Sequence, residues 1–183
     1  MFVCAGNTES FACAKSVGVG LVQSTLNLSR LCLLEKPKEI IFIGTAGSYD
    51  FSMPLLSLFI SHQATQIEES FTLKHSYTPL DNGVQAQAQP TLDLPIALVN
   101  SSNYIHTDAD FSKAMCHAGI LLENMEFFGV LSVAQCYGLP CFGVFCVTNY
   151  TNAHAHRDFI ANHERAKERL EGLINQLKKE QND

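Results

Sequence analysis

Short apolar runs separated by polar turns recur along the chain, and they predict strands that alternate with helices. The runs at residues 40–43, 96–99, 120–122 and 141–147 are apolar at every position. Unbroken apolar runs of this length are typical of strands that are buried on both faces of a parallel sheet. Further strands are predicted at residues 1–6, 13–22, 55–62 and 63–73.

Four segments follow a helical pattern, at residues 21–34, 111–117, 127–136 and 153–179. The last has an apolar or semi-apolar stripe with spacings of three and four, which predicts one buried face: Phe159, His163, Ala166, Leu170, Leu173 and Leu177. Residues 76–93 are predicted to be the least regular part. The alternation predicts one domain over residues 1–183, a three-layer α/β/α sandwich with a mixed, largely parallel central sheet.

The composition is poor in charge, with 46% hydrophobic and 16% charged residues. Globular domains average about 25% charged residues, so we expect part of the surface to be covered in a homodimer or a higher homo-oligomer. The net charge of −6 and the lack of a basic stripe argue against nucleic acid as a partner.

The seven cysteines lie in apolar surroundings without a C-x-x-C motif, which is typical of a reducing cytosol. The first 22 residues do not resemble a signal peptide, and no apolar run is long enough to span a bilayer. We therefore expect a cytoplasmic protein that has no membrane partner.

Glu126 is the most informative single position, because it stands between a predicted core strand and a predicted core helix. A buried carboxylate needs a partner. Either the protein pairs it, or it awaits a ligand with hydroxyl donors, such as the cis-diol of a sugar. Three other predicted strand ends, at residues 43–48, 99–104 and 147–152, are also polar or rich in glycine. Ligands collect at such ends in parallel sheets.

The ordered set of these motifs resembles the nucleoside phosphorylase and nucleosidase superfamily. Gly44-Thr45-Ala46-Gly47 resembles its glycine loop, and Asn124-Met125-Glu126 resembles its ribose-binding Met-Glu element. Together with the preceding Glu123, that element is similar to the corresponding motif of the futalosine hydrolase branch. Thr148-Asn149 stands where the family contacts the base, and residues 17–22 resemble its Gly-x-Gly strand end.

The resemblance implies cleavage of the N-glycosidic bond of a purine-type nucleoside, without a cofactor. Glu9 would activate water, Met125 and Glu126 would bind the ribose, and the glycine loop of Gly44, Thr45, Ala46 and Gly47 would hold the nucleophile. The implied base-binding residues are Tyr104, Phe127 and Asn149, and Asn149 would also stabilise the leaving base. Phe127 also fits the core of its helix.

Two departures from the family pattern refine this expectation. Phe42 stands where phosphorylases commonly carry a phosphate-binding arginine, so hydrolysis is favoured over phosphorolysis, with Arg157 as the remaining candidate for a phosphate contact. Asn149 replaces the aspartic acid of many adenine-preferring members, which favours a 6-oxopurine, while the futalosine-like alternative rests on the residues around Glu126.

Several alternatives stay open at the level of sequence. One is a purine nucleoside phosphorylase, with phosphate as a second small-molecule partner. Another is a nucleoside-binding paralogue with weak catalysis, and a third is a structural oligomer subunit whose Glu126 is paired internally. A metal site is not predicted, because His154, His156 and His163 lack further ligands at a suitable spacing.

Overall fold

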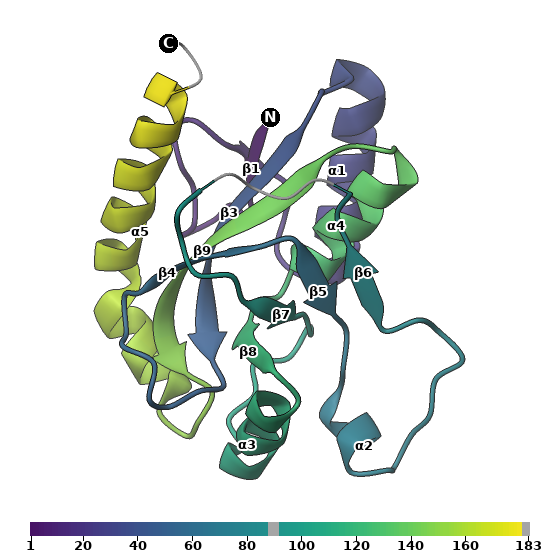
Figure 1. Cartoon of the computed structure of the whole chain (residues 1–183), viewed down its shortest axis with the longest axis vertical. Helices are drawn as coiled ribbons and strands as arrows, with labels where there is room; N and C mark the ends of the chain where they lie inside the picture. Colours follow the sequence, from purple (N-terminus) through teal and green to yellow (C-terminus); the bar gives the residue numbers. More distant parts are fainter. Residues whose placement is uncertain (88–91, 181–183) are drawn as a thin grey trace.

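The computed structural model describes residues 1–87 and 92–180, and it has three layers (Figure 1). A curled sheet lies between one long helix, α5 (Ala155–Glu180), and a pair of helices, α1 (Leu21–Glu35) and α4 (Phe127–Cys136). Two short helices, α2 (Glu69–Thr72) and α3 (Ala109–His117), lie at the lower end of the molecule in Figure 1. This arrangement confirms the predicted α/β/α sandwich.

The sheet is built around two long parallel strands, β3 (Ile40–Ser48) and β9 (Cys141–Tyr150). Its main path runs β2-β1-β3-β8-β7-β5-β6, while β9 pairs with both β3 and β4. The bounds of the shorter strands are β1 (Phe2–Cys4), β2 (Lys15–Ser16), β4 (Leu58–Ser61), β5 (Gln63–Thr65), β6 (Gly83–Gln85), β7 (Leu98–Asn100) and β8 (Ile120–Glu123). Five strand pairs are parallel and three are antiparallel, so the described sheet is mixed and largely parallel, as predicted.

The central strands are apolar throughout because both of their faces are covered. Successive strand residues point to opposite faces, and in β3 they divide between two clusters of buried side chains. Phe42 packs with the side chains of α1 and α4, whereas Ile41 and Ile43 pack with Leu170 and Ile174 of α5. The buried face of α5 contains much of the predicted stripe. Among the described residues, no helix combines the length and apolarity needed to cross a membrane.

Three predicted boundaries were wrong. The strand predicted at 40–43 does not stop at Gly44 but continues to Ser48, because β9 pairs with it along its full length. The strand predicted at 63–73 ends at Thr65, and the polar residues beyond it form α2. Of the strand predicted at 13–22, only the two residues of β2 form a strand, and helix α1 already begins at Leu21.

The region predicted to be least regular, 76–93, contains the short strand β6. Residues 88–91 of that region lie outside the described part of the chain.

Gly143 offers a test of this packing. A Cβ atom at Gly143 of β9 would lie 2.5 Å from the ring of Phe145 and 2.7 Å from that of Phe127. We expect Gly143→Ala to lower the free energy of unfolding by about 2 kcal/mol or more, because overpacked cores must shift or strain. Urea denaturation of the two proteins measures this difference.

Gly172 in α5 provides the matched control, since a Cβ there meets no atom within 4 Å. We expect Gly172→Ala to raise the free energy of unfolding by about 0.5–1 kcal/mol through helix propensity alone. Equal stabilities of the two variants would contradict the packing described for β9.

Candidate functional site

A cavity of about 330 Å³ lies beside the ends of β3, β8 and β9, and the first residues of α5 close part of it. Its volume lies within the range of small-molecule sites, which is about 300–1,000 Å³. The cavity brings together seven of the residues that the sequence proposed for a site: Glu9, Thr45, Ala46, Gly47, Met125, Glu126 and Asn149.

Glu126 is buried, with 3% of its surface exposed. Its side chain contacts the residue that precedes helix α1. Its Oε1 atom accepts a hydrogen bond of 2.9 Å from the backbone N–H of Gly20. Gly20 has a φ of 83°, and a Cβ atom there would lie 2.9 Å from Oδ1 of Asn103. Glycine is therefore required at this point, both for its left-handed backbone and for the close approach.

Burial raises the pKa of the Glu126 carboxyl to about 7, and the charge of Glu9 acts in the same direction, while the hydrogen bond from Gly20 opposes both. Hydrogen bonds from the Asn124 side chain and the Met125 backbone also lower this pKa. The carboxyl also lines the cavity, where a ligand can donate hydrogen bonds to it.

Asn124 links the glutamate to strand β3. Its side-chain oxygen accepts hydrogen bonds from the backbone N–H groups of Glu126 (2.9 Å) and Phe127 (3.0 Å), which begin helix α4. Its amide N–H donates to the carbonyl of Thr45 at 3.1 Å. The sequence reasoning gave Asn124 no role of its own, although asparagine before an apolar helix is a known signal for this kind of cap.

Glu9 approaches the same cavity from the loop after β1. Thr45 donates to this carboxylate through its backbone N–H, at 3.2 Å, and through its hydroxyl. Partial burial raises the pKa of the Glu9 carboxyl, although the hydrogen bonds from Thr45 lower it. His163 of α5 donates to the carbonyl of the preceding Thr8 at 3.0 Å and so fixes the loop. Thr45 therefore contacts both Glu9 and Asn124 and connects the two carboxylates.

Asn149 follows a bulge between β3 and β9 and is 6% exposed. Its side-chain oxygen accepts from the hydroxyl of Thr148 at 2.8 Å, and its amide donates to the carbonyl of Tyr150 at 3.3 Å. One N–H of the amide stays without a partner among the described residues. Gly47 leaves room for this side chain, since a Cβ there would lie 3.0 Å from its nitrogen.

Three predicted site residues do not line the cavity. Tyr104 is 75% exposed, and its ring lies outside the cavity wall. Phe127 is fully buried in the core, where its ring packs edge-on against Phe145 at 5.0 Å. Gly44 lies under the ring of Phe42, with which a Cβ would collide at 2.8 Å.

A buried polar cluster beside the cavity was missed. The Glu123 carboxylate accepts hydrogen bonds from Tyr49 Oη at 2.6 Å, from the backbone of His106 at 3.1 Å and from the His106 ring. Burial lowers the pKa of His106, but the hydrogen bond and charge of Glu123 outweigh it and raise the pKa above its usual value. Glu123 lines the cavity, but its oxygens are already occupied. The partners come from distant segments, so no local pattern indicates them.

The described lining of the cavity is acidic and contains no lysine or arginine. Arg157, the remaining candidate for a phosphate contact, is largely exposed and pairs with Asp158 at 3.1 Å. His156 lines the cavity beside Ala155 and Phe159, all at the start of α5. No group of three potential metal ligands occurs in the described part of the chain.

A family model described as the phosphorylase superfamily matches residues 5–179. The chain belongs to this superfamily. None of the curated protein sequences matches it.

Solved structures of nucleosidases share the fold of this superfamily member. A mutant of the Helicobacter pylori 5′-methylthioadenosine/S-adenosylhomocysteine nucleosidase, holding 5′-methylthioadenosine, superposes with a TM-score of 0.78 at 17% identity, covering 91% of this chain and 79% of that one. A futalosine hydrolase mutant from the same organism gives 0.77 at 18% identity, with coverage of 91% and 80%. The Streptococcus pneumoniae nucleosidase with 8-aminoadenine gives 0.76 at 14% identity, with coverage of 94% and 95%.

The raised pKa of Glu126 predicts how the stability of this phosphorylase-superfamily member depends on pH. Folding lifts this pKa from 4.5 to about 7, so the folded protein keeps a proton that the unfolded chain releases. The free energy of unfolding should therefore fall as pH rises between those values, with a contribution from Glu126 of about 3 kcal/mol. Urea denaturation at a series of pH values measures the fall.

Glu126→Gln isolates this contribution, because the amide does not titrate and still accepts from Gly20. The raised pKa values of Glu9 and His106 act in the same direction and remain in both proteins. We expect the variant to lose less stability than the parent between pH 5 and pH 8. Parallel curves would show that Glu126 is not a protonated, buried carboxyl.

Proposed function

We propose that this protein hydrolyses the N-glycosidic bond of a purine-type nucleoside, with a 6-oxopurine or a futalosine-like base. The observation that carries the proposal is the pair of carboxylates, Glu9 and Glu126, in one cavity that has no lysine or arginine in its described lining. Glycosidic bonds break through an oxocarbenium-like sugar, and carboxylates stabilise the positive charge of that state.

Glu126 binds the ribose in this proposal. The 2′- and 3′-hydroxyls donate to its carboxylate, while Gly20 holds Oε1 in place. Two hydroxyl donors replace the water lost on burial, so the ligand favours the charged form of a carboxyl whose pKa burial raises to about 7. Met125 packs against the sugar from the neighbouring position in the cavity wall.

Glu9 activates the water. The oxygen of water bonds to C1′ of the ribose, and Glu9 takes one of its protons while the bond from C1′ to the base nitrogen breaks. The base leaves with that electron pair and takes up a proton. A raised pKa suits this role, because a base works best with a pKa near the operating pH. The segment Thr45–Gly47 forms the part of the cavity wall that contacts the water.

Asn149 binds the leaving base. Its free N–H donates to N7 or O6 of the purine, which stabilises the charge that develops on the base. A carboxamide has no proton to transfer at neutral pH, so the proton of the base comes from water or a nearby group. His156 lines the same cavity and is the nearby group that could supply it.

Hydrolysis is preferred over phosphorolysis on electrostatic grounds. A phosphate ion would enter a cavity lined by Glu9, Glu123 and Glu126 without a lysine or arginine in the described wall. Bound phosphate is normally held by charge-assisted donors. The structural neighbours whose names state hydrolytic activities, the nucleosidases and the futalosine hydrolase, agree with this choice.

Release of free base tests the proposed reaction. Incubation with inosine, guanosine, 5′-methylthioadenosine and futalosine in phosphate-free buffer, followed by chromatography, should show free base and free sugar in equal amounts. Addition of phosphate should not increase the rate. Release that requires phosphate would instead identify a phosphorylase and contradict the assignment of Glu9 to water.

Substitution of the ribose ligand tests the role of Glu126. We expect Glu126→Gln to lower kcat/KM by about 10²–10³-fold, because one of the two accepting oxygens becomes a donor. Glu171→Gln, an exposed change on α5, is the matched control and should leave the rate unchanged. The kcat/KM values of the parent and the variant should differ less on a 2′-deoxynucleoside than on the ribonucleoside. Equal loss with both substrates would contradict contact with the 2′-hydroxyl.

A nucleoside-binding protein with little turnover is the second candidate, and Asn149 favours it because the amide cannot protonate the base. Calorimetric binding of the same nucleosides without release of base would identify this case. We also propose a homodimer, which is supported by exposed apolar residues on α1, where Val22 is 65% and Leu26 is 66% exposed.

A further inference from the structure

A second pocket, of about 440 Å³, lies between α2 and α3 and shares no lining residue with the nucleoside cavity. We refer to it as the α2–α3 pocket. Its volume falls within the range of about 300–1,000 Å³ that small-molecule sites occupy. The proposed hydrolysis makes no use of it.

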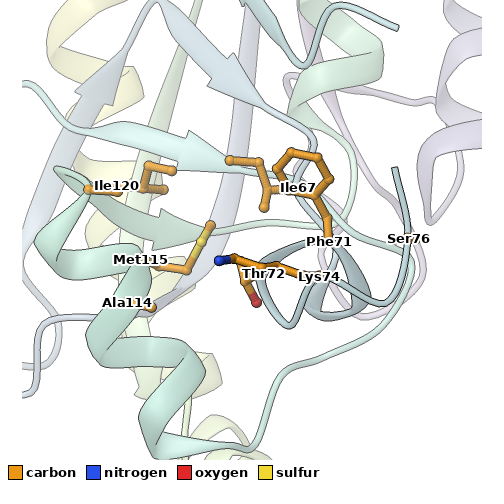
Figure 2. A pocket seen from close by; sticks show the side chains of 9 residues that line it. Ile67, Phe71, Thr72, Lys74, Ser76, Ala114, Met115 and Ile120 are labelled. Carbon is orange, nitrogen blue, oxygen red and sulfur yellow. The ribbon is translucent and has the colours of Figure 1, made fainter. Parts of the chain in front are cut away.

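Apolar side chains form the walls of the α2–α3 pocket. Ile67 and Phe71 lie on one side, and Met115 and Ile120 lie across from them (Figure 2). Phe71 is 41% exposed, so this residue keeps apolar surface in contact with solvent. A ligand with an apolar body would remove this surface from water.

Lys74 brings the one charge of the described lining. Its side chain extends into the pocket, and its ammonium points toward Met115 (Figure 2). This ammonium makes no hydrogen bond or ion pair with the described residues. The hydroxyls of the lining are already engaged, since Thr72 donates to the carbonyl of Glu69 at 2.8 Å and Ser76 bonds Ser70 at 2.9 Å. A single unpaired cation suits a ligand with one negative charge.

The frame of the pocket is fixed before any ligand arrives. Lys74 adopts a left-handed φ of 59°, and its backbone N–H bonds the carbonyl of Phe71 at 3.0 Å. On the opposite side of the segment, the buried side chain of Asn100 holds Ile67 through both backbone groups, at 2.8 Å and 2.9 Å. A preformed pocket avoids much of the ordering cost of binding.

We propose that the α2–α3 pocket binds a small free carboxylic acid with an apolar body, whose carboxylate pairs with Lys74. The apolar part lies among Ile67, Phe71, Met115 and Ile120. A single ammonium matches a monoanion better than a phosphate group, for which sites commonly provide several donors.

Titration with sodium octanoate, followed by NMR of the full chain, tests the proposal. We expect saturable shifts at Ile67, Met115 and Ile120, with affinity increasing up to about fourfold per methylene from butanoate to octanoate. 1-Octanol, which lacks the charge, should bind about tenfold more weakly than octanoate.

Two lysine variants complete the test. Lys74→Met keeps the apolar stem, and it should weaken octanoate about tenfold without changing the binding of 1-octanol. Lys113→Met is the matched control, because Lys113 lies on α3 outside the pocket lining and pairs with Asp110 at 3.0 Å, and it should bind octanoate like the parent. Both lysines are exposed, so neither change threatens the fold.

Three results would overturn the proposal: octanoate binding that is insensitive to Lys74→Met, shifts confined to other surfaces, or self-association of the chain that blocks the pocket. The titration contains no nucleoside and measures no turnover. Its failure would therefore leave the proposed hydrolysis untouched, and failure of the base-release assay would leave this pocket untouched.

Discussion

The burial of the Glu126 carboxyl is the constraint on which the candidate site depends. A buried carboxylate costs several kcal/mol unless it is compensated, and here the compensation from the protein is partial. The N–H of Gly20 reaches one oxygen, and the pKa rises to about 7. The fold supports this position from several sides. Gly20 adopts a left-handed backbone, and Asn124 fixes the residue to the start of α4 and to β3.

The second carboxylate depends on the same frame. Thr45 donates to Glu9 through its backbone and hydroxyl, while its carbonyl accepts from Asn124. Thr45 thus couples the position of Glu9 to that of Asn124. The nearby cluster of Glu123, Tyr49 and His106 illustrates the opposite case, because its carboxylate is saturated by the protein and has no free oxygen for a ligand. Two glutamates three positions apart therefore differ in what they can bind.

The layers of the fold followed from the sequence, because continuous apolar runs in β3 and β9 require cover on both faces. The ends of elements did not follow. Gly44 and Gly47 suggested a loop after residue 43, but pairing with β9 keeps that segment extended. Similarly, the polar segment after Thr65 forms α2 through local backbone bonds that strand propensity does not reveal. Long-range pairing, rather than local preference, set these boundaries.

The candidate site could be predicted in part, because some of its residues follow buried strands whereas others meet only through long-range contacts. Glu126 and Asn149 could be found because each follows a buried strand, and strand ends gather at one edge of the sheet. Tyr104 is not in the cavity wall although its neighbour Ile105 is, and Asn103 of the same loop accepts a hydrogen bond from the backbone N–H of Leu21 at 2.9 Å. His106 and Tyr49 lie far apart in sequence and meet only around Glu123. Such contacts leave no local pattern.

A carbon-13 NMR titration of the glutamate carboxyls, with and without a bound nucleoside, tests the central claim most directly. Comparison with Glu126→Gln identifies the signal of Glu126. The account predicts a pKa near 7 in the free protein, which falls when the ribose hydroxyls donate to the carboxylate. A pKa of 4.5 in the free protein, or a pKa that nucleoside leaves unchanged, would contradict it.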